Sequence, residues 1–150
     1  IRAHVKVTNG LVKALYAELE EAARIDTVPG FARTLSVLVA VEIADISRFH
    51  RPADLHSYAG VIPSTYASGG RMVHGRITKQ GSVWLRWAVV EAVTPAVKKD
   101  PSLRALYLRL ARRKGANVAK IAVARRLLTI IYRLLSERRN YIPEMNQSAA

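Results

Sequence analysis

The segment from residue 121 to residue 135 constrains the fold most, because its apolar residues recur at helical spacing on two faces. One stripe consists of Ile121, Ala124, Leu128, Ile131 and Leu135, and the other of Val123, Leu127, Ile130 and Leu134. A helix that is apolar on two faces is either buried in a core or paired with another subunit. Three arginines interrupt the run, so it does not resemble a membrane span.

Similar periodicity elsewhere, with Pro, Gly or capping residues at the boundaries, predicts a mainly α chain. Helices are expected over residues 5–25, 31–46, 52–58, 81–98, 101–114 and 117–138. Residues 59–80 are expected to form a long glycine-rich central loop, because Gly, Pro, Ser and Thr recur there.

We expect three parts along the chain: residues 1–25 as the end of a helical or coiled-coil linker, 26–139 as the main domain, and 140–150 as a polar, flexible tail. The apolar stripe of the first part suits a coiled coil and an ordinary amphipathic helix equally well. The chain starts at Ile1 without a signal-peptide pattern, and we expect it to be a fragment of a longer protein. The lack of cysteine fits a reducing, intracellular setting.

The charge points to a polyanionic partner. The chain has 24 Lys and Arg against 11 Asp and Glu, which gives a net charge of +13. Basic side chains that neutralise phosphates release counterions, so nucleic acid is the expected partner, with an uninvolved basic surface as the alternative. More than half of the basic residues lie between 98 and 139, including Arg112, Arg113 and Lys114, which we expect to contact the nucleic acid.

The residues Val28-Pro29-Gly30-Phe31, followed by an apolar helix, are typical of a helix-hairpin-helix element that binds DNA. In such an element the N–H groups that begin the second helix face a phosphate. Gly30 permits the close approach, and Arg33 is expected to add a phosphate contact. Ala32 stands where the motif has a second glycine. The alternative is a plain connection between two helices.

A serine among arginines marks the central segment. No acid lies between Asp54 and Glu91. Ser68 is the candidate nucleophile, and Gly69 and Gly70 let the backbone approach a phosphate. The residues expected to hold nucleic acid here are Arg71, His74, Arg76, Lys79 and Arg86.

Alternatives remain for several of these residues. His74 is either a general base or a simple nucleic-acid contact. Ser68 is either a nucleophile or a turn residue bonded to its own backbone, and Ser64 is expected to cap a turn. Trp84 and Trp87 lie three residues apart, which favours burial in the core over stacking on bases.

Several motifs in order resemble the C-terminal domain of the DEDD-type insertion-sequence transposases, the family that includes the Piv/MooV DNA invertases. They are residues 43–49, 55–63, 68–70, 74–81, 84–88, 99–101 and 123–128. The resemblance implies a preceding RuvC-like domain with four acidic ligands for a divalent metal such as Mg²⁺, then a coiled-coil linker. It implies that Ser68 joins covalently to DNA, and that Arg71, Arg76, Lys79 and Arg86 line the phosphate path.

The resemblance also implies DNA as a partner and structured RNA in some members. A homo-oligomer formed through the N-terminal helix is expected as well. A cytoplasmic, nucleoid-associated location is expected, with no membrane contact. No metal site or cofactor is expected in this chain, which alone should bind nucleic acid without recombining it. A non-catalytic helix-hairpin-helix binding module and a structural dimerisation domain are the alternative functions.

Overall fold

The computed structural model describes residues 1–68, 71–77 and 81–143, and residues 64–68 and 71–76 by their backbone alone. Its helices are α1 (Arg2–Glu18), α2 (Glu20–Asp26), α3 (Arg33–Ile43), the 3-10 turn η1 (Ile46–Arg48), α4 (Pro52–Ala59), α5 (Val83–Lys99), α6 (Pro101–Lys114) and α7 (Ala116–Ser136). Its strands are β1 (Pro63–Ser68) and β2 (Arg71–Ile77). The prediction of a mainly α fold is confirmed.

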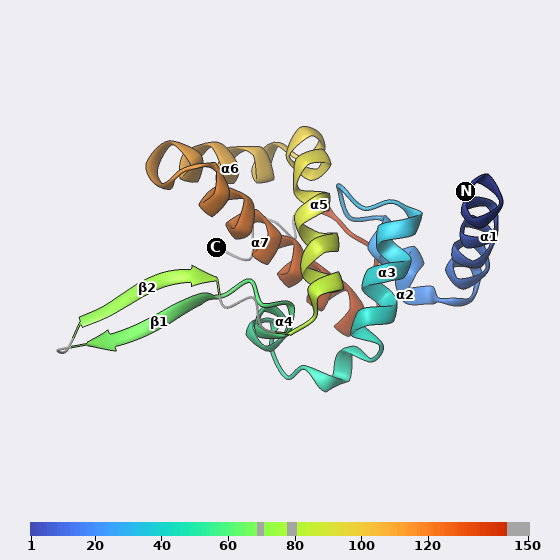
Figure 1. Ribbon diagram of the computed structural model, residues 1–150, viewed down its shortest axis with the longest axis horizontal. Helices are drawn as coiled ribbons and strands as arrows, with labels where there is room; N and C mark the ends of the chain where they lie inside the picture. Colours follow the sequence, from blue (N-terminus) through green and yellow to red (C-terminus); the bar gives the residue numbers. More distant parts are fainter. Residues whose placement is uncertain (69–70, 78–80, 144–150) are drawn as a thin grey trace.

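The core is built around α7, which runs through the middle of the helical body (Figure 1). Helices α2, α4, α5 and α6 all pack against it. Both apolar stripes are covered within the chain, since Val123 and Leu127 of one and Ala124 and Leu128 of the other are fully buried. Of the two explanations that the sequence left open for this helix, burial in the core is therefore correct.

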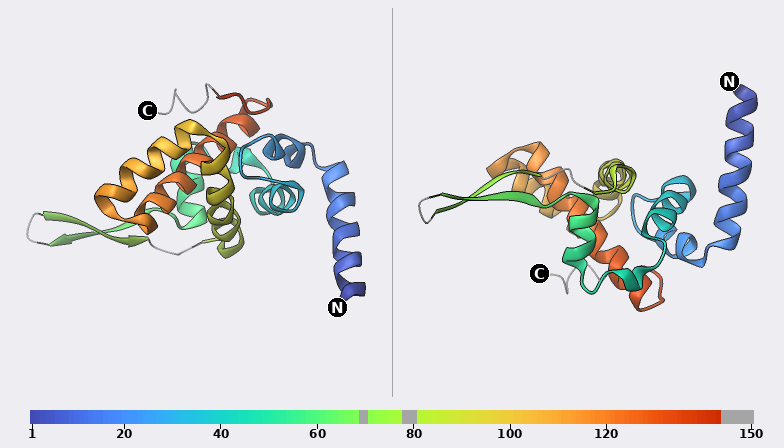
Figure 2. Two further views of the ribbon diagram at one scale, coloured as in Figure 1. Left: turned by 90° about the horizontal axis from the view of Figure 1, so that it is seen from above. Right: turned by 60° about the horizontal axis from the view of Figure 1, so that its bottom comes forward.

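Helix α1 stands at the edge of the body and buries none of its residues (Figure 2). The single helix expected over residues 5–25 is divided at Leu19, whose backbone is extended with φ −95° and ψ 102°. Helix α2 then turns into the body, where Ala22 and Ile25 join the core. Gly10 does not interrupt α1 and has open space around it.

The central segment forms a β-hairpin, so the prediction of an irregular loop there was wrong. Strands β1 and β2 are antiparallel and project from the helical body at the end opposite α1 (Figures 1 and 2). We call this hairpin the arm. Pro63 is opposite Ile77 and Thr65 is opposite His74, so β2 contains one more residue than β1 in this interval. Such a bulge bends the arm near its base.

The predicted helix 101–114 begins and ends as expected because both of its boundaries are encoded locally. Asp100 accepts hydrogen bonds from the backbone N–H groups of Ser102 (2.8 Å) and Leu103 (3.0 Å), and Pro101 occupies the first turn. The hydroxyl of Tyr141 donates to Asp100 Oδ2 at 2.6 Å, and the Tyr141 N–H donates to Thr27 Oγ1 at 2.9 Å. The segment after α7 is thereby attached to α6 and to the turn between α2 and α3.

Candidate nucleic-acid interface

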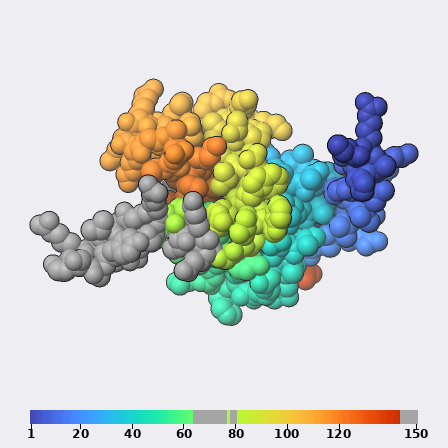
Figure 3. Space-filling view, viewed as in Figure 1, coloured from blue at the N-terminus to red at the C-terminus, as the bar shows by residue number. Residues whose placement is uncertain are grey.

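Charge is segregated along the chain and therefore across the molecule. Seven of the 11 acids precede residue 55, whereas residues 101–136, which form α6 and α7, contain nine Lys or Arg and no Asp or Glu. Helices α6 and α7 meet in a lobe at the end of the molecule opposite α1 (Figure 3). The arm leaves the body on this side. A polyanion is therefore attracted to this end more than to the α1 end.

The cations at the end of α6 are exposed, as the sequence-based prediction of a contact surface requires. Arg112, Arg113 and Lys114 occupy its last turn, where positive charge also stabilises the carbonyl end of a helix. In the part of the chain that the structure describes, none of the three forms an ion pair. Their charge is thus available to phosphates.

The first strand of the arm is fixed to the body through Val61. Gly60 caps the end of helix α4, and its φ of 69° is in the left-handed region that glycine adopts without cost. The N–H of Val61 donates to His56 O at 3.2 Å, and its carbonyl accepts from Arg125 Nη1 of α7 at 3.0 Å. The arm therefore starts, two residues later, from a point bonded to α4 and α7.

The chain that returns from the arm is fixed at Gly81 and Ser82. A Cβ built at Gly81 would lie 2.0 Å from Tyr58 O, so only glycine fits there. The N–H of Ser82 donates to Tyr58 O (2.7 Å), and its hydroxyl donates to Glu42 Oε2 (2.6 Å). The same hydroxyl accepts from Leu85 N at 3.1 Å and begins α5. Both ends of the arm are thus held at the C-terminal end of α4.

Ser68 is the last residue of β1, and its Cα pairs with that of Arg71, the first residue of β2. The strand backbone also contains His74, opposite Thr65, and Arg76. Three predicted contact residues, Gly69, Gly70 and Lys79, lie outside the described residues. The fold therefore gathers the serine and three of its predicted basic neighbours on one hairpin.

Arg86 is placed differently from the other predicted phosphate contacts. It is half-buried in α5, and its Nη1 lies 3.5 Å from the carbonyl oxygen of Ala59. This contact joins α5 to the end of α4, at the base of the arm. Arg86 thus has a structural contact, and its predicted contact with nucleic acid remains a prediction.

Trp84 and Trp87 are exposed, so the expectation that they lie in the core was wrong. Trp84 is 62% and Trp87 48% accessible, and the neighbouring Val83 is 58% accessible. The core-facing side of α5 is formed instead by aliphatic residues, which are Leu85, Ala88, Val89, Ala92, Val93 and Ala96. The start of α5 therefore presents an aromatic surface beside the base of the arm.

Gly30 is buried, and its main contact is with α5 rather than with solvent. Its φ is +94°, and a Cβ would lie 2.2 Å from Ala92 O and 2.8 Å from Ala96 Cβ. Ala32, which stands where the helix-hairpin-helix motif has a second glycine, has a φ of −133°. Any residue adopts this conformation, so the alanine causes no backbone strain. The exposed Arg33 lies with its guanidinium carbon 5.3 Å from the ring centre of Tyr16.

The turn at Gly30 is distant from the arm. It contacts Ala92 and Ala96, ten and fourteen residues along α5 from Ser82, which lies at the base of the arm. At about 1.5 Å per residue these positions are roughly 15–20 Å away along the helix. The structure therefore separates the predicted contacts Gly30 and Arg33 from those on the arm.

Sequence reasoning missed a depression of about 280 Å³ between α4, α6 and α7, which we call the arginine pocket. It is lined by His56, Leu106, Ala122, Arg125, Arg126 and Thr129. The hydroxyl of Thr129 donates to Arg125 O (3.1 Å) and lies 3.0 Å from His56 Nε2. Since that hydroxyl proton is already used, we assign the proton of the neutral imidazole to Nε2.

His56 is held neutral by its surroundings. Burial is the main cause that lowers its pKa to about 4, and the positive charge of Arg125 lowers it further. Burial also lowers the pKa of Arg125, although a guanidinium remains protonated at neutral pH. The pocket is therefore cationic through its arginines, with an uncharged imidazole beside them.

The neutral His56 is expected to make the fold less stable in acid. Its pKa is 6.5 in the unfolded chain and about 4 in the fold, so the unfolded chain binds the extra proton between these values. The free energy of unfolding consequently falls as the pH drops from 6.5 towards 4. Because the ring is partly exposed, we expect a loss of about 2 kcal/mol, less than the full shift would give.

Urea unfolding at about pH 7 and about pH 4.5 measures this loss. His56→Gln should remove the loss of stability in acid that His56 causes. Replacing the exposed His50 by glutamine should leave that loss unchanged. Equal acid losses in the wild type and His56→Gln would show that another group is responsible.

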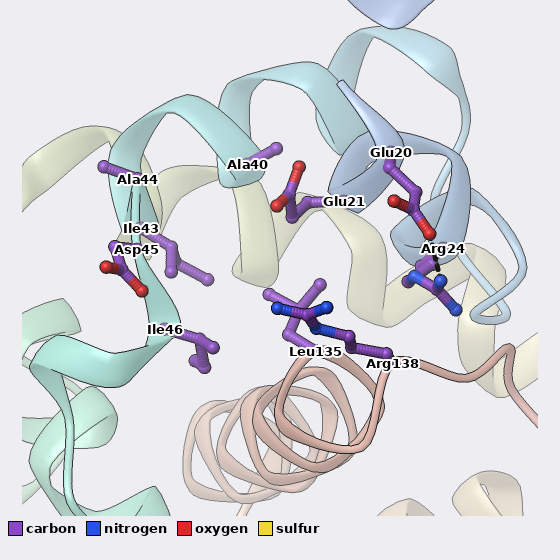
Figure 4. A pocket seen from close by; sticks show the side chains of 10 residues that line it. All are labelled: Glu20, Glu21, Arg24, Ala40, Ile43, Ala44, Asp45, Ile46, Leu135 and Arg138. Carbon is purple, nitrogen blue, oxygen red and sulfur yellow. Dashed lines mark hydrogen bonds and ion pairs between the residues drawn. The ribbon is translucent and has the colours of Figure 1, made fainter. Parts of the chain in front are cut away.

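A second depression, of about 270 Å³, lies at the other end of the molecule between α2, α3 and the end of α7 (Figure 4). Its rim carries Glu20, Glu21 and Asp45 together with Arg24 and Arg138. Arg24 pairs with Glu20. This mixture of charges gives no preference for a phosphate, unlike the arginine pocket.

Glu42 and Asp45, at the end of α3 and just after it, both accept hydrogen bonds that stabilise the fold. Glu42 accepts the bond from Ser82, and Asp45 accepts one from Ser47 N at 2.9 Å. The bonds to Ser47 lower the pKa of Asp45.

Among the described residues, no three His, Asp or Glu side chains gather in a way that would hold a metal ion. Within residues 1–68, 71–77 and 81–143, no helix is long and apolar enough to cross a membrane.

The chain is similar to several transposases. It is 31% identical over 134 residues to the transposase for insertion sequence element IS1111A of Coxiella burnetii. The aligned residues make up 87% of this chain and 37% of that protein. It is 26% identical over 140 residues to a probable family 20 transposase of Pseudomonas aeruginosa, with 89% and 41% covered. An insertion element IS110 protein of 43.6 kDa from Streptomyces coelicolor is 28% identical over 115 residues, with 75% and 28% covered.

The chain thus spans less than half the length of each of these relatives. The family profile described as transposase IS116/IS110/IS902 matches residues 22–108, from α2 to the middle of α6. The matched region contains the arm and both of its attachments to α4. Since it covers more than half of the 150 residues, this protein belongs to the IS116/IS110/IS902 family of transposases.

Proposed function

We propose that this chain is the part of a transposase that binds DNA and supplies Ser68 as the nucleophile for strand exchange. The observation that carries the proposal is the arm, in which Ser68 and Arg71 are paired at the end of a hairpin that extends from the body. The resemblance to the serine-bearing domain of the DEDD-type transposases, which goes beyond the family membership, supports the same assignment.

In the proposed step, Ser68 Oγ bonds to the phosphorus of a backbone phosphate, and the bond from phosphorus to one neighbouring deoxyribose oxygen breaks. The serine proton passes to a base, for which His74 is the candidate, and the departing oxygen takes up a proton. The product is a serine–phosphate diester, so a second DNA hydroxyl can attack the same phosphorus and release the serine. Guanidinium groups of Arg71 and Arg76 would stabilise the charge of the transition state.

The divalent metal that the resemblance implies would be held by a RuvC-like domain outside this segment. The proposed step of Ser68 uses only the chain's own residues.

We further propose that α1 pairs with a second copy of the chain. Its exposed apolar residues Val5, Leu11 and Leu15 support this proposal, and sedimentation equilibrium of the chain with Leu11→Glu tests it.

DNA binding is supported by the segregation of charge and by the surfaces beside the arm. The exposed Arg112, Arg113 and Lys114 offer contacts to phosphates. Trp84 and Trp87 offer flat faces on which unpaired bases stack. The first turn of α3, which has no side-chain cap and carries Arg33, is a second candidate contact.

The binding half of the proposal is tested by the salt dependence of affinity for duplex DNA. We expect the logarithm of the association constant to fall with the logarithm of salt concentration with a slope of roughly −4 or steeper, since each neutralised phosphate contributes about −0.9. Arg112→Gln/Arg113→Gln/Lys114→Gln should reduce the slope by roughly 2–3. Structured RNA, the other polyanion implied by the resemblance, can be compared in the same titration.

The matched control removes the same number of charges from the exposed surface of α1, as Arg2→Gln/Lys6→Gln/Lys13→Gln. We expect this triple variant to keep the wild-type slope. If both triple variants reduced the slope equally, net charge alone would explain the binding, and the interface at α6 would be refuted.

A further inference from the structure

The arginine pocket is the concave site where the two acid-free stretches of the chain meet. His56 comes from the stretch that contains the arm, residues 55–90, and the remaining lining residues come from α6 and α7, within 101–136. Two arginines and no acid line this depression of about 280 Å³. The pocket therefore suits a small anionic group.

We propose that the arginine pocket binds one backbone phosphate of the DNA, with the guanidinium groups of Arg125 and Arg126 as its ligands. This inference rests on the proposed function and adds a binding site to it. A guanidinium carries five N–H donors, and Arg125 uses one of them for Val61 O. That bond orients its side chain before any ligand arrives, which reduces the entropic cost of binding.

The hydrogen bond from Arg125 to Val61 O also connects the pocket to the arm. Arg125 holds the carbonyl of Val61, and β1 begins two residues later at Pro63. The five residue steps from Pro63 to Ser68 span roughly 17 Å of strand. A phosphate held in the pocket would therefore fix the position of the DNA relative to Ser68, as phosphate contacts typically set register.

The first test titrates the full chain with inorganic phosphate and follows its histidine ring protons by NMR. Below about pH 6 phosphate is mainly a monoanion, like a DNA phosphodiester. We expect phosphate to raise the pKa of His56, because a bound anion offsets the charge of Arg125 and Arg126. The exposed His4 and His50 should not respond. Equal responses of all three rings would overturn the pocket.

The second test measures duplex DNA binding by Arg126→Gln against a matched control on the same helix. We expect Arg126→Gln to weaken binding about 5–10-fold and to reduce the salt slope by about 0.9. The control is Arg133→Gln, two turns further along α7, where the arginine pairs with Glu137 at 3.7 Å outside the pocket. It should keep the wild-type slope. Arg126→Lys should also keep that slope, because it retains the charge.

The outcomes separate this inference from the proposed function. If the chain binds DNA but Arg126→Gln and Arg133→Gln have equal slopes, the pocket is overturned and the DNA-binding proposal stands. If the chain shows no salt-dependent DNA binding, the proposed function fails whatever inorganic phosphate does. Thermal unfolding followed by circular dichroism checks that each variant is folded, and Arg126→Lys supplies the comparison if Arg126→Gln is not.

Discussion

Replacement of Ser68 by alanine is expected to abolish strand transfer by a full-length transposase that carries this segment, with a loss of roughly three orders of magnitude or more. The alanine side chain has no oxygen to bond to phosphorus, and nothing else in the proposed step replaces it. Because Ser68 is the last residue of β1 and pairs with Arg71 across the hairpin, we expect its replacement by alanine to change the free energy of unfolding by less than about 0.5 kcal/mol. DNA affinity should remain within about twofold.

Ser64→Ala is the matched control for this experiment, because Ser64 lies on the same strand near the base of the arm. We expect this variant to transfer strands at the wild-type rate. Strand-transfer assays on a supercoiled donor measure both variants. Wild-type activity in Ser68→Ala would remove the nucleophile from the proposed function and leave a DNA-binding module.

Replacement of Gly30 by alanine is expected to destabilise the fold by about 3–4 kcal/mol. The positive φ of +94° costs a residue with a Cβ about 1–2 kcal/mol. Steric overlap with Ala92 O, which would lie 2.2 Å from the new Cβ, adds about 1–3 kcal/mol, because relieving it requires a shift of the α5 backbone. Urea unfolding measures the change.

Two other glycines separate these causes. Gly115 has a φ of +93° and a ψ of 162°, with no atom within 4 Å of a built Cβ, so Gly115→Ala should cost only the backbone strain, about 1–3 kcal/mol. Gly10 lies in the middle of α1 in open space, and Gly10→Ala should stabilise by about 0.5–1 kcal/mol. If Gly30→Ala cost no more than Gly115→Ala, the close packing of the turn on α5 would be refuted.

The helices could be predicted where their signals are local. Pro52 and the pair Asp100-Pro101 occupy the starts of α4 and α6, and each residue stabilises the first turn through its own geometry. The burial of α7 also followed from the sequence, because two apolar stripes leave no other stable environment in water than a core or a partner. Which of these two applied depended on the neighbouring helices.

The arm was missed although a signal for it was present. Gly69 and Gly70 separate two runs that contain Thr65, Tyr66 and Val73, and two glycines between such runs favour a two-residue hairpin turn. The density of glycine and serine in residues 59–80 instead suggested an irregular loop. The resemblance implies a functional role for Ser68, but only the strand pairing places its backbone opposite Arg71.

Other features depend on contacts between distant parts of the sequence. His56 and Thr129 are 73 residues apart, so no local pattern indicates the arginine pocket. Trp84 and Trp87 have the spacing of a buried stripe, but leucine, valine and alanine residues of α5 occupy the core side and leave the tryptophans exposed. The packing of Gly30 against Ala92 and Ala96 could not be predicted, because these residues lie more than 60 positions away in the sequence, and its contact with a phosphate remains a prediction.

The proposed bond between Ser68 and a DNA phosphorus atom can be detected by mass spectrometry of a full-length transposase trapped on its DNA substrate and then digested with protease and nuclease. We expect a nucleotide attached through phosphate to the peptide that contains Ser68, on its Oγ, and no such product from Ser68→Ala. A nucleotide attached to Ser64 or any other residue, or strand transfer with no protein–DNA bond at any stage, would contradict this proposal.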